Sequence, residues 1–198
     1  MAKKIKILLA GDSFAAKWNG EYPGWADLLS KEYSVKNVAQ AGVGEYKILK
    51  QIENNNTKEF NLVIVSHTSP FRVHTPTHPI KRKGLHENCD LIFNDLENNQ
   101  DKSNESLVTA LNWFKHHYDE QYQEDIYRLM RSEIDRNVQT LYLALDHTSA
   151  SSHFGHELNH LDFSEYWPSN RGDVNHYTKE GNEFIFKSIV DKIKEMSV

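Results

Sequence analysis

The sequence predicts an α/β protein with a doubly wound, mostly parallel sheet flanked by helices. Short runs of Val, Ile and Leu recur along the chain and are nearly continuous, which is typical of strands buried on both faces. Stretches with apolar residues three or four positions apart separate these runs, and that spacing is typical of amphipathic helices. The length, 198 residues, suits one domain with a substantial core.

Four segments are expected to form the strands of this sheet. The first is polar at its start, apolar through its length, and followed by Gly11-Asp12-Ser13. The second is weaker, because its apolar residues are fewer. In chain order the expected strands cover Ile5–Ala10, Ser34–Val38, Leu62–Val65 and Leu141–Leu145.

Five helices are expected between and after these strands, each from an apolar stripe at helical spacing. In chain order the stripes are Trp25 to Leu29 after Pro23-Gly24; Tyr46, Leu49 and Ile52; Leu107, Leu111, Phe114 and Tyr118; Ile126, Leu129, Met130 and Ile134; and Phe184, Ile185, Ile189, Val190 and Ile193.

The stretch from His67 to Asn104 interrupts the alternation of strands and helices. It is polar and contains Pro70, Pro76 and Pro79. A segment of this length without clear secondary structure is uncommon inside a compact domain. We interpret residues 67–104 as a loop-rich insertion after the third strand, lying over the edge or top of the sheet, within a single domain that spans residues 1–198.

The composition argues against several classes of partner. The net charge of −5 does not favour nucleic acid, which requires a basic face. No run approaches 18 apolar residues, so we expect no membrane span. Cys89 is the only cysteine, so the chain forms no internal disulfide, which fits a reducing cytoplasm. We therefore expect a cytoplasmic protein, whose oligomeric state the sequence leaves open.

Ser13 stands just beyond the first predicted strand, where ligands bind in open α/β sheets. A serine nucleophile needs a base, and the base needs an orienting acid. Near the other end of the chain, "GDVNHYTKEGN" places Asp173 and His176 on one loop before the last predicted helix. Asp173 can hold the imidazole of His176, and His176 can take the proton of Ser13. Either motif alone would also suit a turn with Asp12 or Ser13 as a helix cap.

Short blocks of the chain resemble the SGNH (GDSL-type) hydrolase family, from Lys4 to about Ile193. The block "AGDSF" carries the expected nucleophile Ser13, "NVAQAGVGEYKI" places Gly42 at the family's oxyanion glycine, and "DVNHYTKEGN" matches the family's Asp-x-x-His block. The resemblance implies a flavodoxin-like SGNH hydrolase fold and cleavage of carboxylic esters by Ser13, His176 and Asp173. It implies no cofactor and no metal.

The third block of the family differs in this chain. Where the family has Gly-x-Asn-Asp, the sequence reads "VIVSHTSPFR", with Ser66 at the glycine and Thr68 at the asparagine. The expected oxyanion hole therefore consists of the main-chain N–H groups of Ser13 and Gly42 and the hydroxyl of Thr68. With the asparagine missing, activity could be weak. The alternative is a binding module that keeps the fold without competent chemistry.

The expected substrate is a small-molecule or carbohydrate ester, such as an O-acyl group on a sugar. Its acyl group, its alcohol and the acceptor of the acyl group are left open. Asp12 and Arg72 are the candidate substrate-binding residues, since Arg72 follows the third block and could clamp an anionic group. Asp146-His147, after the last predicted strand, is an alternative acid–base pair.

A second motif competes with this interpretation. The stretch "HFGHELNHLDF" contains His156-Glu157-x-x-His160, the spacing of a zinc peptidase. On a helix the two histidines would share one face, with Glu157 as base. No histidine follows at the extended spacing that would supply a third ligand, so we favour surface histidines over a zinc site.

Overall fold

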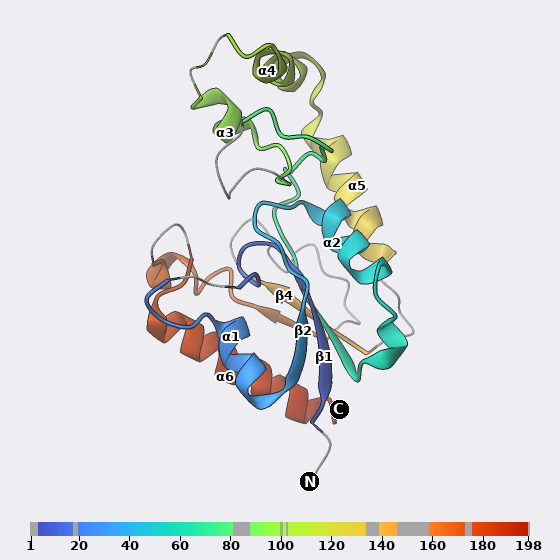
Figure 1. Cartoon of the computed structure of the whole chain (residues 1–198), viewed down its shortest axis with the longest axis vertical. Helices are drawn as coiled ribbons and strands as arrows, with labels where there is room; N and C mark the ends of the chain where they lie inside the picture. Colours follow the sequence, from blue (N-terminus) through green and yellow to red (C-terminus); the bar gives the residue numbers. More distant parts are fainter. Residues whose placement is uncertain are drawn as a thin grey trace.

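The computed structural model describes residues 4–17, 20–80, 88–99, 101, 103–133, 139–145, 159–172 and 176–197. Within these residues, five parallel strands form one sheet in the order β2-β1-β3-β4-β5 (Figure 1). The strands are β1 Lys6–Gly11, β2 Ser34–Asn37, β3 Leu62–Ser66, β4 Thr140–Ala144 and β5 His160–Asp162. The predicted fold class, a doubly wound parallel sheet flanked by helices, is confirmed.

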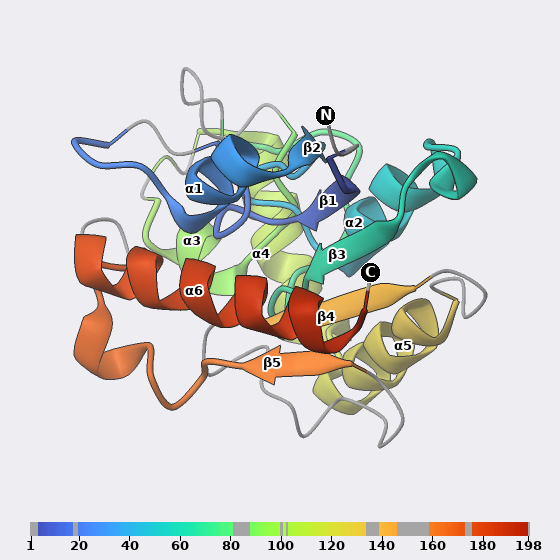
Figure 2. The ribbon, with the colours of Figure 1, turned by 90° about the horizontal axis from the view of Figure 1, so that it is seen from below.

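Helices cover both faces of the sheet, as two views at right angles agree (Figures 1 and 2). One face packs against the first and last helices, and the other packs against the helix after β2 and the long helix before β4. In chain order the α-helices among the described residues are α1 Trp25–Glu32, α2 Glu45–Glu53, α3 Phe93–Glu97, α4 Glu105–His117, α5 Glu120–Ser132 and α6 Lys179–Glu195.

The alternation of side chains along each strand divides the core into two clusters. In β1, Ile7 and Leu9 face α1 and α6, whereas Leu8 and Ala10 face α2. All of them are buried, because helices lie on both sides. Because the strands are buried on both faces, their sequences are nearly continuous apolar runs.

The chain between β3 and β4 builds a separate lobe (Figure 1). We call the described residues from Val73 to Tyr118, which include α3 and α4, the insertion lobe. It has its own apolar cluster around Ile80, Leu96 and Leu107. From this lobe α5 runs back along the body of the protein and packs beside α2.

Two elements differ from the sequence-based expectation. Helix α3 lies inside residues 67–104, the stretch expected to lack secondary structure; its five residues are too few to show a helical repeat. Strand β5 was not expected, because its three residues are polar at both ends and only partly buried. Among the described residues, no helix has both the length and the apolar character needed to cross a membrane.

Candidate active site

Ser13 lies on a tight turn at the carboxyl end of β1. The main-chain oxygen of Asp12 accepts from the N–H groups of Ala15 and Ala16 at 3.2 and 3.0 Å, and the Oδ1 of Asp12 accepts from the N–H of Phe14 at 3.0 Å. These bonds reverse the chain just after the strand. The turn presents Ser13, which is half-buried, at the edge of the sheet where ligands bind in this class of fold.

The strand residue before this turn is held from both sides. On one side Gly11 pairs with Ser66 of β3. On the other side the side-chain amide of Gln51, on α2, accepts from the N–H of Gly11 at 2.8 Å and donates to its carbonyl at 3.1 Å. A Cβ on Gly11 would lie only 2.6 Å from the Cβ of Ser66, so glycine is needed at this position because the two strands approach so closely.

His176 reaches Ser13 across the whole length of the chain. Its Nε2 lies 3.2 Å from the main-chain oxygen of Ser13, and its ring lies 5.1 Å from the ring of Phe14. Both residues line one small pocket with Gly24, Tyr177 and Asn182. For proton transfer, Nε2 would have to turn from the main-chain oxygen to the Ser13 hydroxyl. Catalytic hydrogen bonds often tighten in this way only when substrate is bound.

The structure fixes His176 through the residues that follow it. Tyr177 is buried in the core, and its hydroxyl donates to the carbonyl of Leu145 at 2.5 Å. The hydroxyl of Thr178 accepts from the N–H of Gly181 and so caps α6. His176 is thereby held between a buried anchor and the start of a helix. The predicted acid Asp173 lies outside the described residues, as do Asp146 and His147.

Gly42 lies in a loop between β2 and α2, and its φ of +76° is a conformation that favours glycine. A Cβ there would also collide with the Sγ of Cys89. The next residues lead into α2, with Gly44 as its N-cap. Both the backbone conformation and the position of Cys89 therefore exclude a larger residue at position 42.

Two predicted site residues have different partners from those expected. The hydroxyl of Thr68 donates to the Oδ2 of Asp12 at 2.9 Å, and both residues are buried. The single proton of Thr68 is therefore bonded within the protein. Asp12 is only 1% exposed, and its carboxylate accepts hydrogen bonds from the turn and from Thr68.

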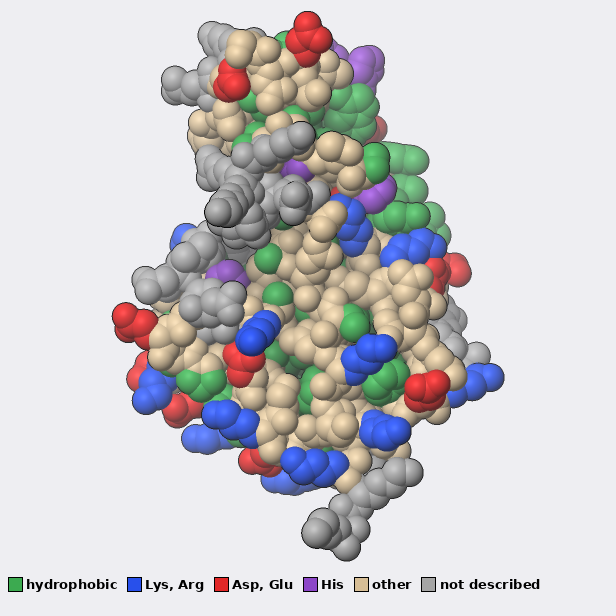
Figure 3. All heavy atoms as spheres, in the orientation of Figure 1, with side chains coloured by type: hydrophobic (Ala, Val, Ile, Leu, Met, Phe, Trp, Pro, Cys, Tyr) green, Lys and Arg blue, Asp and Glu red, His purple; other side chains and the backbone are tan. Residues whose placement is uncertain are grey.

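Arg72 occupies a position between the turn and a larger pocket. Its Nη2 lies 4.0 Å from the Oδ2 of Asp12. It also lines a pocket of about 350 Å³ enclosed by α2, the insertion lobe and α5. Several aromatic side chains line this pocket, and Figure 3 shows apolar side chains and histidines together on that side of the lobe. The aromatic lining residues are Tyr46, Trp113, Tyr118 and Tyr122.

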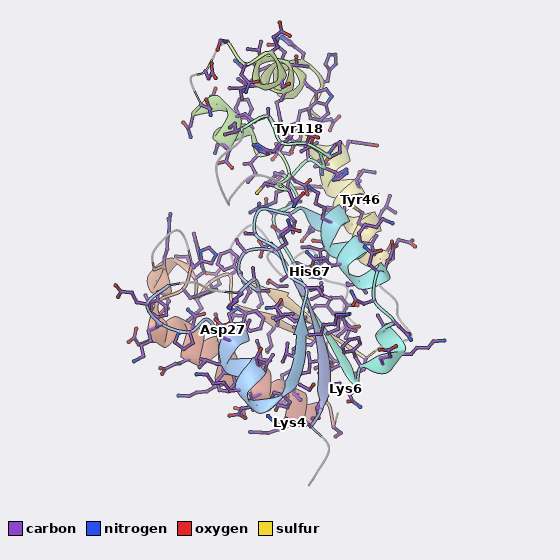
Figure 4. The ribbon with its side chains drawn as sticks, viewed as in Figure 1. Lys4, Lys6, Asp27, Tyr46, His67 and Tyr118 are labelled. Carbon is purple, nitrogen blue, oxygen red and sulfur yellow. The ribbon has the colours of Figure 1, made fainter. Side chains whose placement is uncertain are left out.

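A buried polar cluster lies beneath that pocket, at the carboxyl end of β3. His67, labelled in Figure 4, lies below Tyr46 in that view. Its Nδ1 is 2.6 Å from the Oε1 of Glu45, and its ring stacks on Tyr142 with 5.5 Å between centroids. Burial lowers the pKa of His67 below the ordinary value of 6.5, and the charge of Arg131 lowers it further, whereas Glu45 opposes the shift. We expect His67 to be neutral in the folded protein.

The zinc motif is not arranged as that hypothesis required. His160 is the first residue of β5, so a helix does not continue through it. The His-Glu-x-x-His pattern binds zinc when its two histidines lie one turn apart on the same helix. The helical interpretation is therefore wrong at His160. His156 and Glu157 lie outside the described residues.

The strand order β2-β1-β3-β4-β5, with Ser13 after the first strand and His176 before the last helix, has the fold of SGNH (GDSL-type) hydrolases. A GDSL-like lipase from Bacteroides thetaiotaomicron has this fold with a TM-score of 0.55, at 11% identity over 96% of this chain and 88% of that chain. A protein described as an acylhydrolase, from Bacteroides fragilis, gives 0.54 at 13% identity over 96% and 87%.

A catalytic mutant of the acetylxylan esterase Axe2 from Geobacillus stearothermophilus is also similar. Its TM-score is 0.52, at 12% identity over 96% of this chain and 94% of that chain. No family model matches the chain, and no curated protein matches it in sequence. At these identities the likeness establishes the fold.

Sequence reasoning missed the residues that hold the site from a distance. Gln51 binds the main chain of Gly11, the Nδ2 of Asn37 donates to the carbonyl of Ala15 at 2.8 Å, and Asp90 binds the N–H of Gly44. Each acts on main-chain atoms far away in the sequence, and such pairing leaves no local pattern.

Proposed function

We propose that this protein is a serine hydrolase that cleaves carboxylic esters with Ser13 as nucleophile, His176 as general base and Asp173 as the acid that orients the base. The observation that carries the proposal is the meeting of Ser13 and His176, from opposite ends of the chain, in one small pocket. Their positions after β1 and before α6 support it, as does the fold shared with esterases and lipases.

The reaction begins when the Oγ of Ser13 attacks the ester carbonyl while its proton passes to the Nε2 of His176. The tetrahedral intermediate collapses, the bond to the alcohol breaks, and His176 returns its proton to the leaving oxygen. Water, activated by His176 in the same way, then releases the carboxylic acid from Ser13. Asp173, when hydrogen-bonded to the other ring nitrogen, would stabilise the imidazolium that forms in both steps.

The developing oxyanion would be stabilised by main-chain N–H groups of Ser13 and Gly42. Such donors are effective because they are fixed before charge develops. The left-handed conformation of Gly42 and the close contact with Cys89 support a fixed loop there. Since the hydroxyl of Thr68 is bonded to Asp12, the hole would lack the side-chain donor that the resemblance implies.

The substrate we propose is an O-acyl ester of a carbohydrate or a related small molecule. The aromatic pocket beside Arg72 supports this, since it combines ring faces with the charged and polar side chains that can bind hydroxyl groups. One protein of similar fold is an acetylxylan esterase. Arg72, on the wall of this pocket, would bind the substrate by donating hydrogen bonds from its guanidinium group.

The direct test is the Ser13→Ala variant, assayed with a short p-nitrophenyl ester. We expect turnover to fall to the background rate with an unchanged melting temperature, because only the nucleophilic oxygen is removed. His176→Ala should have nearly the same effect, since the two residues act as a unit. Ser132→Ala, an exposed serine at the end of α5, and His116→Ala are matched controls that should keep full activity. Ester turnover that persists in Ser13→Ala would refute the assignment.

The second candidate is a binding module of the same fold with weakened chemistry. The engagement of Thr68 with Asp12 favours it, because a hole with fewer donors stabilises the transition state less. Reaction with a fluorophosphonate separates the two functions. A covalent adduct on Ser13 that is absent from Ser13→Ala supports the hydrolase, whereas binding of acylated sugars without any adduct supports the module.

A further inference from the structure

Asp90 connects the insertion lobe to the loop that carries Gly42. It directly precedes Leu91, which forms an antiparallel bridge with Val73 inside the lobe. The side chain of Asp90 is fully buried. It is therefore a carboxylate enclosed between two parts of the protein that are distant in sequence.

One oxygen and the main chain of Asp90 hold the loop. Its Oδ2 accepts from the N–H of Gly44 at 2.6 Å, and its own N–H donates to the carbonyl of Gly42 at 2.9 Å. Both ends of the three-residue stretch from Gly42 to Gly44 are thus fixed by one residue. A Cβ on Gly44 would lie 3.1 Å from the Oδ2 of Asp90 and from the Cβ of Arg72, so a larger residue would require these side chains to shift by a few tenths of an ångström. We call the two hydrogen bonds between Asp90 and this stretch the clamp.

The other oxygen of Asp90 is held by the lobe and by α2. Its Oδ1 lies 2.9 Å from the Nζ of Lys47, and it accepts from the N–H of Thr75 at 3.0 Å. The Nδ1 of His74 lies 3.2 Å away. Charge-assisted bonds of this kind are short and strong, and several of them restrict a carboxylate to one orientation.

We propose that Asp90 is a positioning residue that sets the orientation of the Gly42 N–H in the oxyanion hole, an inference that rests on the proposed function. Glycine has more backbone freedom than any other residue, so a loop bounded by two glycines needs an external restraint. An oxyanion donor is effective only when it is aimed at the charge before that charge develops. Asp90 supplies this restraint from the insertion lobe, so the lobe determines the catalytic competence of the body.

The test is Asp90→Asn, with kcat and KM measured on a short p-nitrophenyl ester. An asparagine can keep its oxygen towards Gly44, but its NH₂ group then faces the donors of Lys47 and Thr75 and disrupts the clamp. Misaligning one donor should lower kcat by roughly 10- to 100-fold, below the effect of about 10²–10³ for removing one. KM should change by less than about twofold, since the donor acts mainly on the transition state. Hydrogen exchange at the Gly44 amide should accelerate in the same variant.

Leu107→Ala is the matched control, because it destabilises the lobe core without touching Asp90. At a temperature where both variants are folded, it should keep kcat near that of the wild type. If Asp90→Asn does not fold, Lys47→Met decides by the same criterion, with an expected severalfold fall in kcat at unchanged KM. A wild-type kcat in the folded Asp90 variant, or an equal loss in Leu107→Ala, would overturn the proposal.

The outcomes also separate this proposal from the proposed function. If the wild-type protein has no ester turnover that depends on Ser13, the proposed function fails and the role of Asp90 falls with it. If the turnover depends on Ser13 but does not change in the Asp90 variant, the proposed hydrolase function is supported and only the positioning role of Asp90 is rejected.

Discussion

The two faces of the sheet are built from different chemistry. The face covered by α1 and α6 is mainly apolar, with Trp25 and Leu29 of α1 and Ile189 of α6 in one core cluster; the buried Asn182 of α6 accepts from the N–H of Trp25. On the face covered by α2 and α5, the apolar cluster lies over the strands themselves. Towards the carboxyl ends of the strands this face contains the buried pair His67 and Glu45, with Arg131 close enough to affect the pKa of His67.

The difference shows how the protein divides stability from function. Apolar burial is non-directional and needs no partner, so the first face can stabilise the fold at any pH. Buried polar groups are stable only with fixed partners, and they specify one arrangement of the elements that carry them. The polar cluster lies beside α2, which also carries Lys47, paired with Asp90, and Gln51, bound to Gly11 just before the Ser13 turn.

Ile189→Ala tests the apolar face and should have the largest effect on stability. Its side chain is fully buried in the larger core cluster. Truncation to alanine should lower the free energy of unfolding by about 2–5 kcal/mol, through lost burial and the cavity that remains. Urea unfolding at pH 5.5 and pH 8 measures this, and the loss should be the same at both values.

The control for this prediction is Lys187→Ala, an exposed position on the same helix, which should change stability by less than about 0.5 kcal/mol. A loss in Ile189→Ala that depended strongly on pH would mean that the apolar face is coupled to titrating groups. The contrast between the two faces would then be incorrect.

Thr68→Val should have a smaller effect and tests the junction between the faces. The substitution is nearly isosteric but removes the donor to the buried carboxylate of Asp12. Loss of a buried hydrogen bond to a charged group costs about 1.5–3 kcal/mol, so the melting temperature should fall. Because the Thr68 hydroxyl is already bonded, kcat should stay within about threefold of the wild type when the oxyanion donors are main-chain groups alone. A fall of tenfold or more in kcat at unchanged stability would show that the hydroxyl acts on the substrate.

His67→Gln should have the smallest effect and tests the polar face through pH. The folded-state pKa of His67 is lowered, so on acidification the unfolded chain takes up this proton first. The contribution of His67 is therefore present above about pH 6.5 and is lost as the pH falls towards its folded value. The glutamine side chain could still donate to Glu45, but it does not titrate. The variant should therefore lose less stability than the wild type between pH 7.5 and 5.5. The slopes of the two curves should differ by at most about 1.4 kcal/mol per pH unit.

The measurement is the free energy of unfolding at several pH values for both proteins. The other ten histidines are common to both, so their contributions cancel in the difference. Parallel curves for the wild type and the variant would show that the pKa of His67 is the same in the folded and unfolded states. That result would contradict the prediction that burial lowers the pKa.

The fold was predictable for strands that are buried on both faces and for helices long enough to repeat their apolar stripe. Strands β1, β3 and β4 are apolar on both faces, and α6 repeats its stripe over 17 residues. Strand β5 could not be recognised, since its exposed ends carry His160 and Asp162 and its pairing with β4 is set by the body already formed. Helix α3 is stabilised by lobe contacts through Leu96, not by its own periodicity.

The candidate site was predictable where position along the chain implies position in the fold. Ser13 follows a strand and His176 precedes a helix, so the topology of an open sheet brings both to one edge. The partners of Thr68 and Asp12 were not predictable, because two buried polar groups can satisfy each other wherever the backbone places them. The proposed role of Asp90 depends on its contact with Gly44, which lies 46 positions earlier in the chain. No local spacing in the sequence indicates such a contact.

The Gln51 side chain completes the hydrogen bonding of Gly11 at the edge of β1. The pairing of β2 with β1 ends at Leu9 and Asn37, and beyond it the N–H of Gln40 still donates to the carbonyl of Gly11 at 3.0 Å. The amide of Gln51 presents one acceptor and one donor to Gly11, as a peptide unit of a neighbouring strand would. A side chain of a helix thus shares the last residue of β1 with the main chain of Gln40. Any displacement of α2 would be transmitted through Gln51 to Gly11, the residue just before the turn that carries Ser13.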